Sequence, residues 1–318
     1  MLIAHFKITG IAVSQIFLLA AVGFFLVKKK FLSGQGLDDL SSLVMDVTLP
    51  VLIFCQLIKD FSFSLYPDWW IFPLISIAVT LLGLLIGFLF SNFIKGEQNK
   101  LQFLSLVAFQ NSGYLPLALV AALLSPARAG AMFIYLFLFL MGFNLVMFSV
   151  GVHILNFHKE RKLKIKSLFS MPVVATIFSL IMVYLGFNRF FPQAIIKPLR
   201  MLGDTTLPLA MLVVGGNLAQ ISLMHINKKA VSLLILAKMI ILPALGLVLI
   251  SILKIPELIG LLILIQLSMP SAVTLTVILR SYKKEDILAS QGIFLTHIAG
   301  IITIPVFLIL YFSRIMIR

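Results

Sequence analysis

Cysteine and charged residues are scarce in this sequence. Its 318 residues include one cysteine, Cys55, so no disulfide can form within a single chain. Charged residues make up 11% of the chain, whereas a soluble domain carries roughly 25%. Hydrophobic residues make up 61%, which leaves too little polar surface for a water-soluble protein. We therefore expect an integral membrane protein.

Histidines are also few and isolated. No His or Cys pair stands at the spacing of metal ligands, so we expect no metal site. The net charge of +14 could indicate a nucleic-acid partner, but the basic residues occupy short links between apolar segments and are not interleaved with stacking aromatics. A membrane topology with its positive links in the cytoplasm explains the charge better. The expected partner is the lipid bilayer, with no nucleic acid and no bound cofactor.

Long apolar runs bounded by charge predict an all-α membrane protein. The runs approach the length of about 20 residues that a helix needs to cross a bilayer, and they lack the alternation of a barrel strand. The approximate predicted spans are 8–27, 37–58, 69–94, 101–124, 129–155, 168–187, 198–220, 230–253, 257–279 and 287–312.

A repeated pentapeptide divides these ten spans into two halves. Asp46-Val-Thr-Leu-Pro50 recurs as Asp204-Thr-Thr-Leu-Pro208, in predicted spans two and seven. Because each half has an odd number of spans, the second half must enter the membrane from the opposite side, which makes the repeat inverted. We expect a first repeat over 1–157, a basic cytoplasmic link over 158–167 and a second repeat over 168–318.

The basic residues predict the orientation of the chain. With the link between the halves in the cytoplasm, 15 Lys and Arg residues lie inside and nine lie outside. We therefore expect both termini outside, in the cytoplasmic (inner) membrane of a bacterium.

A second pair of motifs predicts broken helices in spans four and nine. These are Gln110-Asn-Ser-Gly-Tyr-Leu-Pro116 and Gln266-Leu-Ser-Met-Pro270, whose prolines should interrupt the helices near mid-membrane. If the breaks cross, the half-helices after them direct their positive ends at one point, which favours an anionic group. The predicted substrate-binding residues are Gln110, Asn111, Ser112, Gly113, Pro116, Gln266, Ser268 and Pro270.

The repeated motif predicts a proton or cation site, because an intramembrane carboxylate must be protonated or find a partner. Its candidate residues are Asp46, Thr48, Asp204 and Thr206. The alternative is that each Asp caps a helix near a membrane face. Further supporting residues are Lys238, Asn217 and His297. Lys238 could extend its ammonium group to the interface, pair with an Asp or attract an anion.

These motifs, in this order and spacing, resemble those of the auxin efflux carrier family. The matching segments are Asn111–Pro116, Ser170–Pro172, Leu207–Gly215, Lys238 with Pro243, and Ser268–Pro270. The resemblance implies two inverted five-helix repeats, a scaffold and a transport domain, and a crossing of spans four and nine at Pro116 and Pro270. It also implies organic anion substrates, among them auxin, malonate and malate.

The same resemblance implies that Asn111 and the two prolines belong to the binding region. Asp46 matches a span that holds a polar support site in plant members of the family. Ser112 and Tyr114 stand where Thr and Phe are more usual, so the resemblance does not fix the substrate. It does not fix the coupling ion either, which could be a proton or sodium.

The expected function is secondary active transport of a small organic anion, of the efflux carrier type, by alternating access around the crossing of helices 4 and 9. The alternative is a sodium-coupled symporter of the bile acid carrier type. An aspartyl enzyme built on Asp46 and Asp204 is disfavoured because no Gly-x-Gly-Asp loop accompanies either residue. A receptor would need a signalling partner. We expect no enzyme activity, and a homodimer is a possible assembly.

Overall fold

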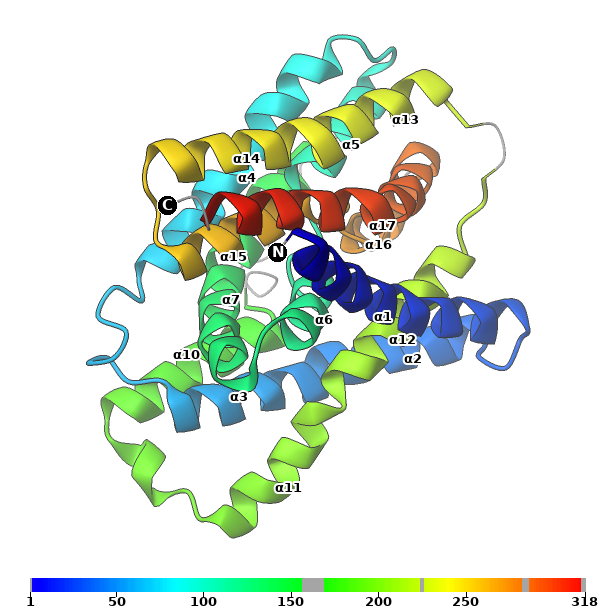
Figure 1. The fold of residues 1–318 in the computed structure, drawn as a ribbon. Coiled ribbons are helices and arrows are strands. Elements are labelled where there is room, and N and C mark those ends of the chain that lie inside the picture. The colour runs from blue at the N-terminus through cyan, green and yellow to red at the C-terminus, as the bar shows by residue number, and fades with distance from the viewer. Residues whose placement is uncertain (1, 156–168, 224–225, 282–285, 316–318) are drawn as a thin grey trace.

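The computed structural model describes residues 2–155, 169–223, 226–281 and 286–315, and these are helical with short connections (Figure 1). The predicted link over 158–167 lies outside the described residues. Seven helical stretches are long and apolar enough to cross a membrane: Thr9–Lys28, Gly34–Asp60, Ile71–Ser91, Pro126–Leu155, Gln193–Ala219, Lys228–Ile252 and Ile287–Arg314. The all-helical membrane architecture is therefore confirmed.

In the first half of the chain the helices follow the predicted spans closely. They are α1 (Leu2–Lys28), α2 (Gly34–Leu43), η1 (Val44–Thr48), α3 (Leu49–Asp60), α4 (Ile71–Ser91), α5 (Glu97–Ala108), α6 (Tyr114–Leu123), α7 (Pro126–Val146), η2 (Met147–Gly151) and α8 (Val152–Leu155). Ser33 begins α2 by accepting a hydrogen bond from the Gly36 amide, and Pro126 opens α7, where a missing amide proton costs nothing.

The second half of the chain is also divided into several helices. Its elements are α10 (Met171–Tyr184), η3 (Phe187–Phe190), α11 (Gln193–Asp204), α12 (Thr206–Ala219), α13 (Lys228–Ile235), η4 (Leu236–Ile241), α14 (Leu242–Ile252), α15 (Glu257–Ser268), α16 (Thr274–Ser281) and α17 (Ile287–Ile315). Predicted spans four and nine are each split into two helices, and α10 is shorter than predicted span six.

Close helix packing depends on glycines at two crossings. A Cβ atom on Gly215 of α12 would lie 1.7 Å from the Ala20 carbonyl oxygen of α1, and one on Gly142 of α7 would lie 2.2 Å from Ser76 Oγ of α4. These contacts pack α1 against α12 and α4 against α7. In addition α3 packs against α10 and α11, α4 against α5, and α15 against α14 and α17. Figure 1 shows α11 at the edge of the molecule, away from the split helices.

Three helical stretches contain π-helical turns, which are uncommon and frequently mark functional positions. They are η1, η2 and η4. Asp46 lies in η1 and Lys238 lies in η4, so two residues that the sequence singles out occupy irregular helix.

Candidate functional site

The two split helices cross at their breaks. The first break, residues 109–113, separates α5 from α6, and the second break, residues 269–273, separates α15 from α16. Gln110 and Ser271 form an antiparallel bridge between them. The Asn111 amide donates to the Pro270 carbonyl at 2.8 Å, and the Ala272 amide donates to the Phe109 carbonyl at 2.9 Å. The backbone groups that the helices leave unpaired are thus used across the crossing.

Side chains complete this backbone pairing. Ser271 Oγ donates to the Leu106 carbonyl at 2.7 Å, and the Ser271 amide donates to Thr296 Oγ1 of α17 at 3.3 Å. Gln266 Nε2 of α15 donates to the Ser112 carbonyl at 3.1 Å. All of these residues are buried, so the bonds hold the two breaks together in an environment without competing water.

The positions of the prolines differ from the sequence-based interpretation. Helix α5 ends at Ala108, well before Pro116, which instead lies in the first turn of α6. A proline there removes no helical hydrogen bond, so Pro116 does not interrupt the helix. Pro270, by contrast, lies within the second break. The two prolines therefore occupy different positions relative to their helices, Pro116 inside α6 and Pro270 after the end of α15.

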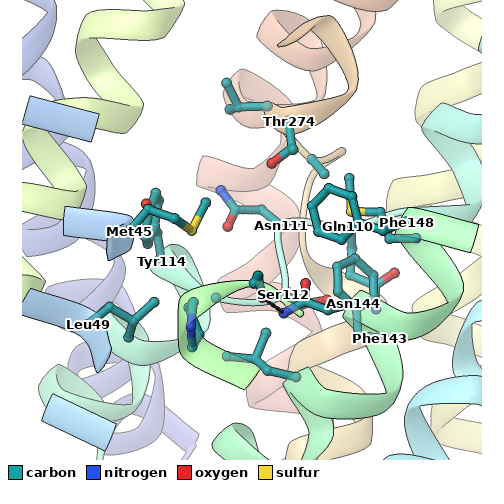
Figure 2. A pocket seen from close by; sticks show the side chains of 17 residues that line it. Met45, Leu49, Gln110, Asn111, Ser112, Tyr114, Phe143, Asn144, Phe148 and Thr274 are labelled. Carbon is teal, nitrogen blue, oxygen red and sulfur yellow. Dashed lines mark hydrogen bonds between the residues drawn. The ribbon is translucent and has the colours of Figure 1, made fainter. Parts of the chain in front are cut away.

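A cavity of about 180 Å³ lies beside the crossing (Figure 2). Residues from both breaks and from five helical stretches (η1 with α3, α6, α7 with η2, the start of α10, and α16) line it. They are Met45, Leu49, Gln110, Asn111, Ser112, Gly113, Tyr114, Leu140, Phe143, Asn144, Met147, Phe148, Ser170, Pro172, Ala272, Val273 and Thr274. The cavity therefore contains the starts of both α6 and α16, where backbone amides give a helix its positive end.

The cavity has a polar part and an apolar part. Amide and hydroxyl groups come from Gln110, Asn111, Ser112, Tyr114, Asn144, Ser170 and Thr274, whereas the remaining lining is mainly Leu, Met and Phe. The described lining includes no charged side chain. Figure 2 shows Asn111 between Tyr114 and Gln110, below Thr274.

Several polar atoms at this site lack a hydrogen-bond partner in the part of the chain that the structure describes. Gln110 Nε2 and Ser112 Oγ are buried and unpaired, and they flank Asn111, which also lines the cavity. Asn144 Nδ2 donates to Ser170 Oγ at 3.3 Å, which joins α7 to the start of α10. Buried polar atoms without partners carry a free-energy cost, so these groups are available for a bound ligand or water.

Four of the eight predicted binding residues, Gln110, Asn111, Ser112 and Gly113, line the cavity. The other four lie outside its lining. Pro116 is inside α6, Pro270 accepts the bond from Asn111, and Gln266 supports Ser112. Ser268 is buried, and its hydroxyl has no partner among the described residues.

The repeated motif forms a separate region. Its two hydroxyls, Thr48 Oγ1 and Thr206 Oγ1, are fully buried and have no described partner, whereas Asp46 and Asp204 are exposed. Segment η1 packs against α11 and α12, so the two copies of the motif lie near each other. Neither Asp lines the cavity, although Met45, the neighbour of Asp46, does.

The predicted supporting residues have well-defined partners. Lys238 Nζ donates to the Val107 carbonyl of α5 at 2.8 Å. Asn217 Nδ2 donates to the Val213 carbonyl of its own helix at 2.9 Å, and His297 Nδ1 lies 2.8 Å from the Ile293 carbonyl of its own helix. Of the three residues, Lys238 is the one whose bond reaches a split helix.

Sequence reasoning did not assign four polar residues of the cavity lining to the binding site: Tyr114, Asn144, Ser170 and Thr274. Tyr114 and Ser170 belong to the segments that carry the family resemblance, but were not predicted to bind substrate. Asn144 stands alone within the apolar run of α7, and Thr274 follows the second motif by four residues. An isolated amide in an apolar span was an available indication for Asn144. Nothing in the sequence distinguished Thr274.

Comparison with known proteins identifies the family of the chain. A family model described as "Membrane transport protein" matches residues 9–308. The chain belongs to the auxin efflux carrier family. Within this family, Protein PIN-LIKES 6 of Arabidopsis thaliana is 28% identical over 120 residues, which cover 37% of this chain and 28% of the plant protein. Carriers of the auxin efflux type are membrane transporters and not enzymes, and the predicted family is confirmed.

Proposed function

We propose that the chain is a secondary active transporter that exports a small organic anion by alternating access around the crossing of its two broken helices. The observation that carries this proposal is the group of polar side chains at the first break, Asn111 with the unpaired Gln110 Nε2 and Ser112 Oγ, in a cavity that also contains the starts of α6 and α16. A carboxylate there would accept hydrogen bonds from Asn111 and Gln110 and interact favourably with two positive helix ends.

The lining supports a substrate with one charged end and an apolar body. Without a Lys or Arg side chain in the described lining, the anion would be held by neutral donors, which suits a single carboxylate. The aromatic and aliphatic wall of Phe143, Phe148 and Leu140 would cover the remainder of the molecule. The cavity of about 180 Å³ is smaller than the roughly 300–1,000 Å³ of pockets that hold drug-sized ligands, which supports a small substrate.

The helix pairing supports ten spans in two inverted halves. In that scheme α1 and α12 belong to spans one and seven, and α10 and α3 belong to spans six and two. If the two halves are exchanged, span one becomes span six and span seven becomes span two, so a contact of α1 with α12 becomes a contact of α10 with α3. Both contacts are present. The same exchange turns the contact of α4 with α5 into the contact of α14 with α15.

A difference between the halves supports alternating access. Helix α1 packs against α6, whereas its counterpart α10 borders the cavity at Ser170 and Pro172. The cavity therefore lies next to the helix that follows the basic link over 158–167, which the sequence predicts to be cytoplasmic. We take this conformation to be open toward the cytoplasm, in a bacterial inner membrane with both termini outside.

The coupling ion and assembly are further parts of the proposal. The buried hydroxyls of Thr48 and Thr206, with Asp46 and Asp204 in the same motifs, are the candidate site for a coupling proton or sodium ion. A homodimer is compatible with the exposed edge formed by α11.

Uptake into proteoliposomes tests the function. Radiolabelled indole acetate, malate and malonate would be offered with and without sodium, proton and voltage gradients, and Asn111→Ala would serve as the control. Saturable uptake that the variant loses is expected, with the monocarboxylate preferred. Absence of saturable uptake for every anion, from folded protein under each gradient, would contradict an anion carrier.

A further inference from the structure

Lys238 is a buried basic residue beside the crossing. Its side chain is 1% exposed, and its ammonium group donates to the Val107 carbonyl, one residue before the end of α5. In the described residues no carboxylate lies within 4 Å of it, and the ion pairs that are formed, Arg128 with Glu257 and Arg280 with Asp286, lie elsewhere. The sequence-based alternatives of interfacial exposure and of an ion pair with an Asp are thus disfavoured.

The helices around Lys238 provide no nearby acid. Segment η4 packs against α13, α14, α4, α5, α15 and α17. The acids of α5 and α15 are Glu97 and Glu257, each the first residue of its helix. Glu97 precedes Val107 by ten residues, or about 15 Å along a helix. On α17, the ionisable residue next in sequence to Thr296, which bonds to the second break, is His297. Its Nδ1 lies beside the Ile293 carbonyl of the same helix.

A buried charge without a counter-ion is costly in a membrane protein, and such residues usually serve the transported species. The position of Lys238 indicates what this role is. The carboxyl end of α5 carries a partial negative charge, and it lies two residues before Gln110 in the cavity. Without compensation this helix end would repel an anion. At the equivalent end of α15, no described Lys or Arg donates to the carbonyls.

We propose that Lys238 is a positioning residue for anionic substrates, because its ammonium group on the Val107 carbonyl reverses the negative field of the α5 carboxyl end next to the cavity. This inference rests on the proposed function and adds a residue that does not touch the substrate. It explains how a cavity without a charged side chain in its described lining can hold a carboxylate.

The test compares a carboxylate with its neutral amide, such as indole acetate with indole acetamide, in protein reconstituted in nanodiscs at fixed ionic strength. A screen of carboxylates on the wild type selects the pair. Lys238→Gln keeps a donor for Val107 and removes the charge. We expect Lys238→Gln to lower the affinity for the carboxylate about tenfold and to change the affinity for the amide less than about twofold. A tenfold loss is the order expected for removal of a unit charge ~10 Å from the carboxylate at an effective dielectric constant of ~20.

Lys228→Gln is the matched control, because it removes the same charge from an exposed position on the same helical stretch, away from the crossing. It should leave the affinity ratio of carboxylate to amide unchanged. Lys238→Met, whose unbranched side chain fills similar space, provides a second variant if the first does not fold. Equal losses of affinity for carboxylate and amide in Lys238→Gln, or no loss for either, would overturn the positioning role but not the proposed carrier function. Failure of every carboxylate to bind the wild type would overturn both proposals.

Discussion

The break between α5 and α6 and the break between α15 and α16 use similar backbones for different purposes. The first break directs polar side chains toward the cavity, and Gln110 Nε2 and Ser112 Oγ are unpaired among the described residues. In the second break, Ser271 bonds to Leu106 and Thr296, and Ala272 and Val273 present apolar surface to the cavity. We infer from this difference that the first break recognises the proposed substrate, while the second break holds the crossing in place.

The largest effect on this comparison should come from Asn111→Ala. Loss of a hydrogen bond to a charged group is worth about 1.5–3 kcal/mol, so the affinity for the carboxylate should fall roughly 10–100-fold. Binding to purified protein in nanodiscs measures it. Asn217→Ala is the control, because that amide bonds to its own helix and lies outside the cavity lining. Similar losses in both variants would indicate a general effect of removing a buried amide.

Ser271→Ala should act on stability more than on binding. It leaves the buried Leu106 carbonyl without the serine hydroxyl, at a cost of about 1–3 kcal/mol in the free energy of unfolding. We expect a lower melting temperature in detergent and an affinity within about threefold of the wild type. Ser268→Ala removes a buried hydroxyl that has no described partner, so it should melt close to the wild type. A large affinity loss in either variant would bring the second motif into the binding site.

Thr274→Val examines the polar contribution that the start of α16 makes to the cavity. A neutral hydrogen bond contributes about 0.5–1.5 kcal/mol, so the affinity should fall roughly two- to tenfold if the hydroxyl meets the substrate. The valine keeps the shape of the side chain. An effect as large as that of Asn111→Ala would mean that both breaks recognise the substrate equally, which would contradict the division of roles.

The sequence predicts the membrane class, the family and the crossing because these depend on apolar run length and on local motifs. Gln110, Asn111 and Ser112 were predicted from the proline-containing motif of span four, and they line the cavity. Asn144 was missed because an isolated amide in α7 indicates a polar role but not which site it joins, and tertiary packing brings α7 to the crossing. The repeated motif identifies helices that do pack together, yet packing buries Thr48 and Thr206 and leaves both Asp residues exposed.

The smallest effect should come from Pro116→Ala, although the sequence motif draws attention to this proline. Pro116 lies in the first turn of α6, where its missing amide proton is not required, and alanine has a higher helix propensity. We expect less than about 0.5 kcal/mol of change in the free energy of unfolding and an unchanged affinity. A melting curve and a binding isotherm measured alongside Asn111→Ala decide this. If Pro116→Ala lost binding, the proline would be needed to hold the first break open. If Pro116→Ala binds like the wild type, the pairing of Gln110 with Ser271 is sufficient to hold the first break open between α5 and α6.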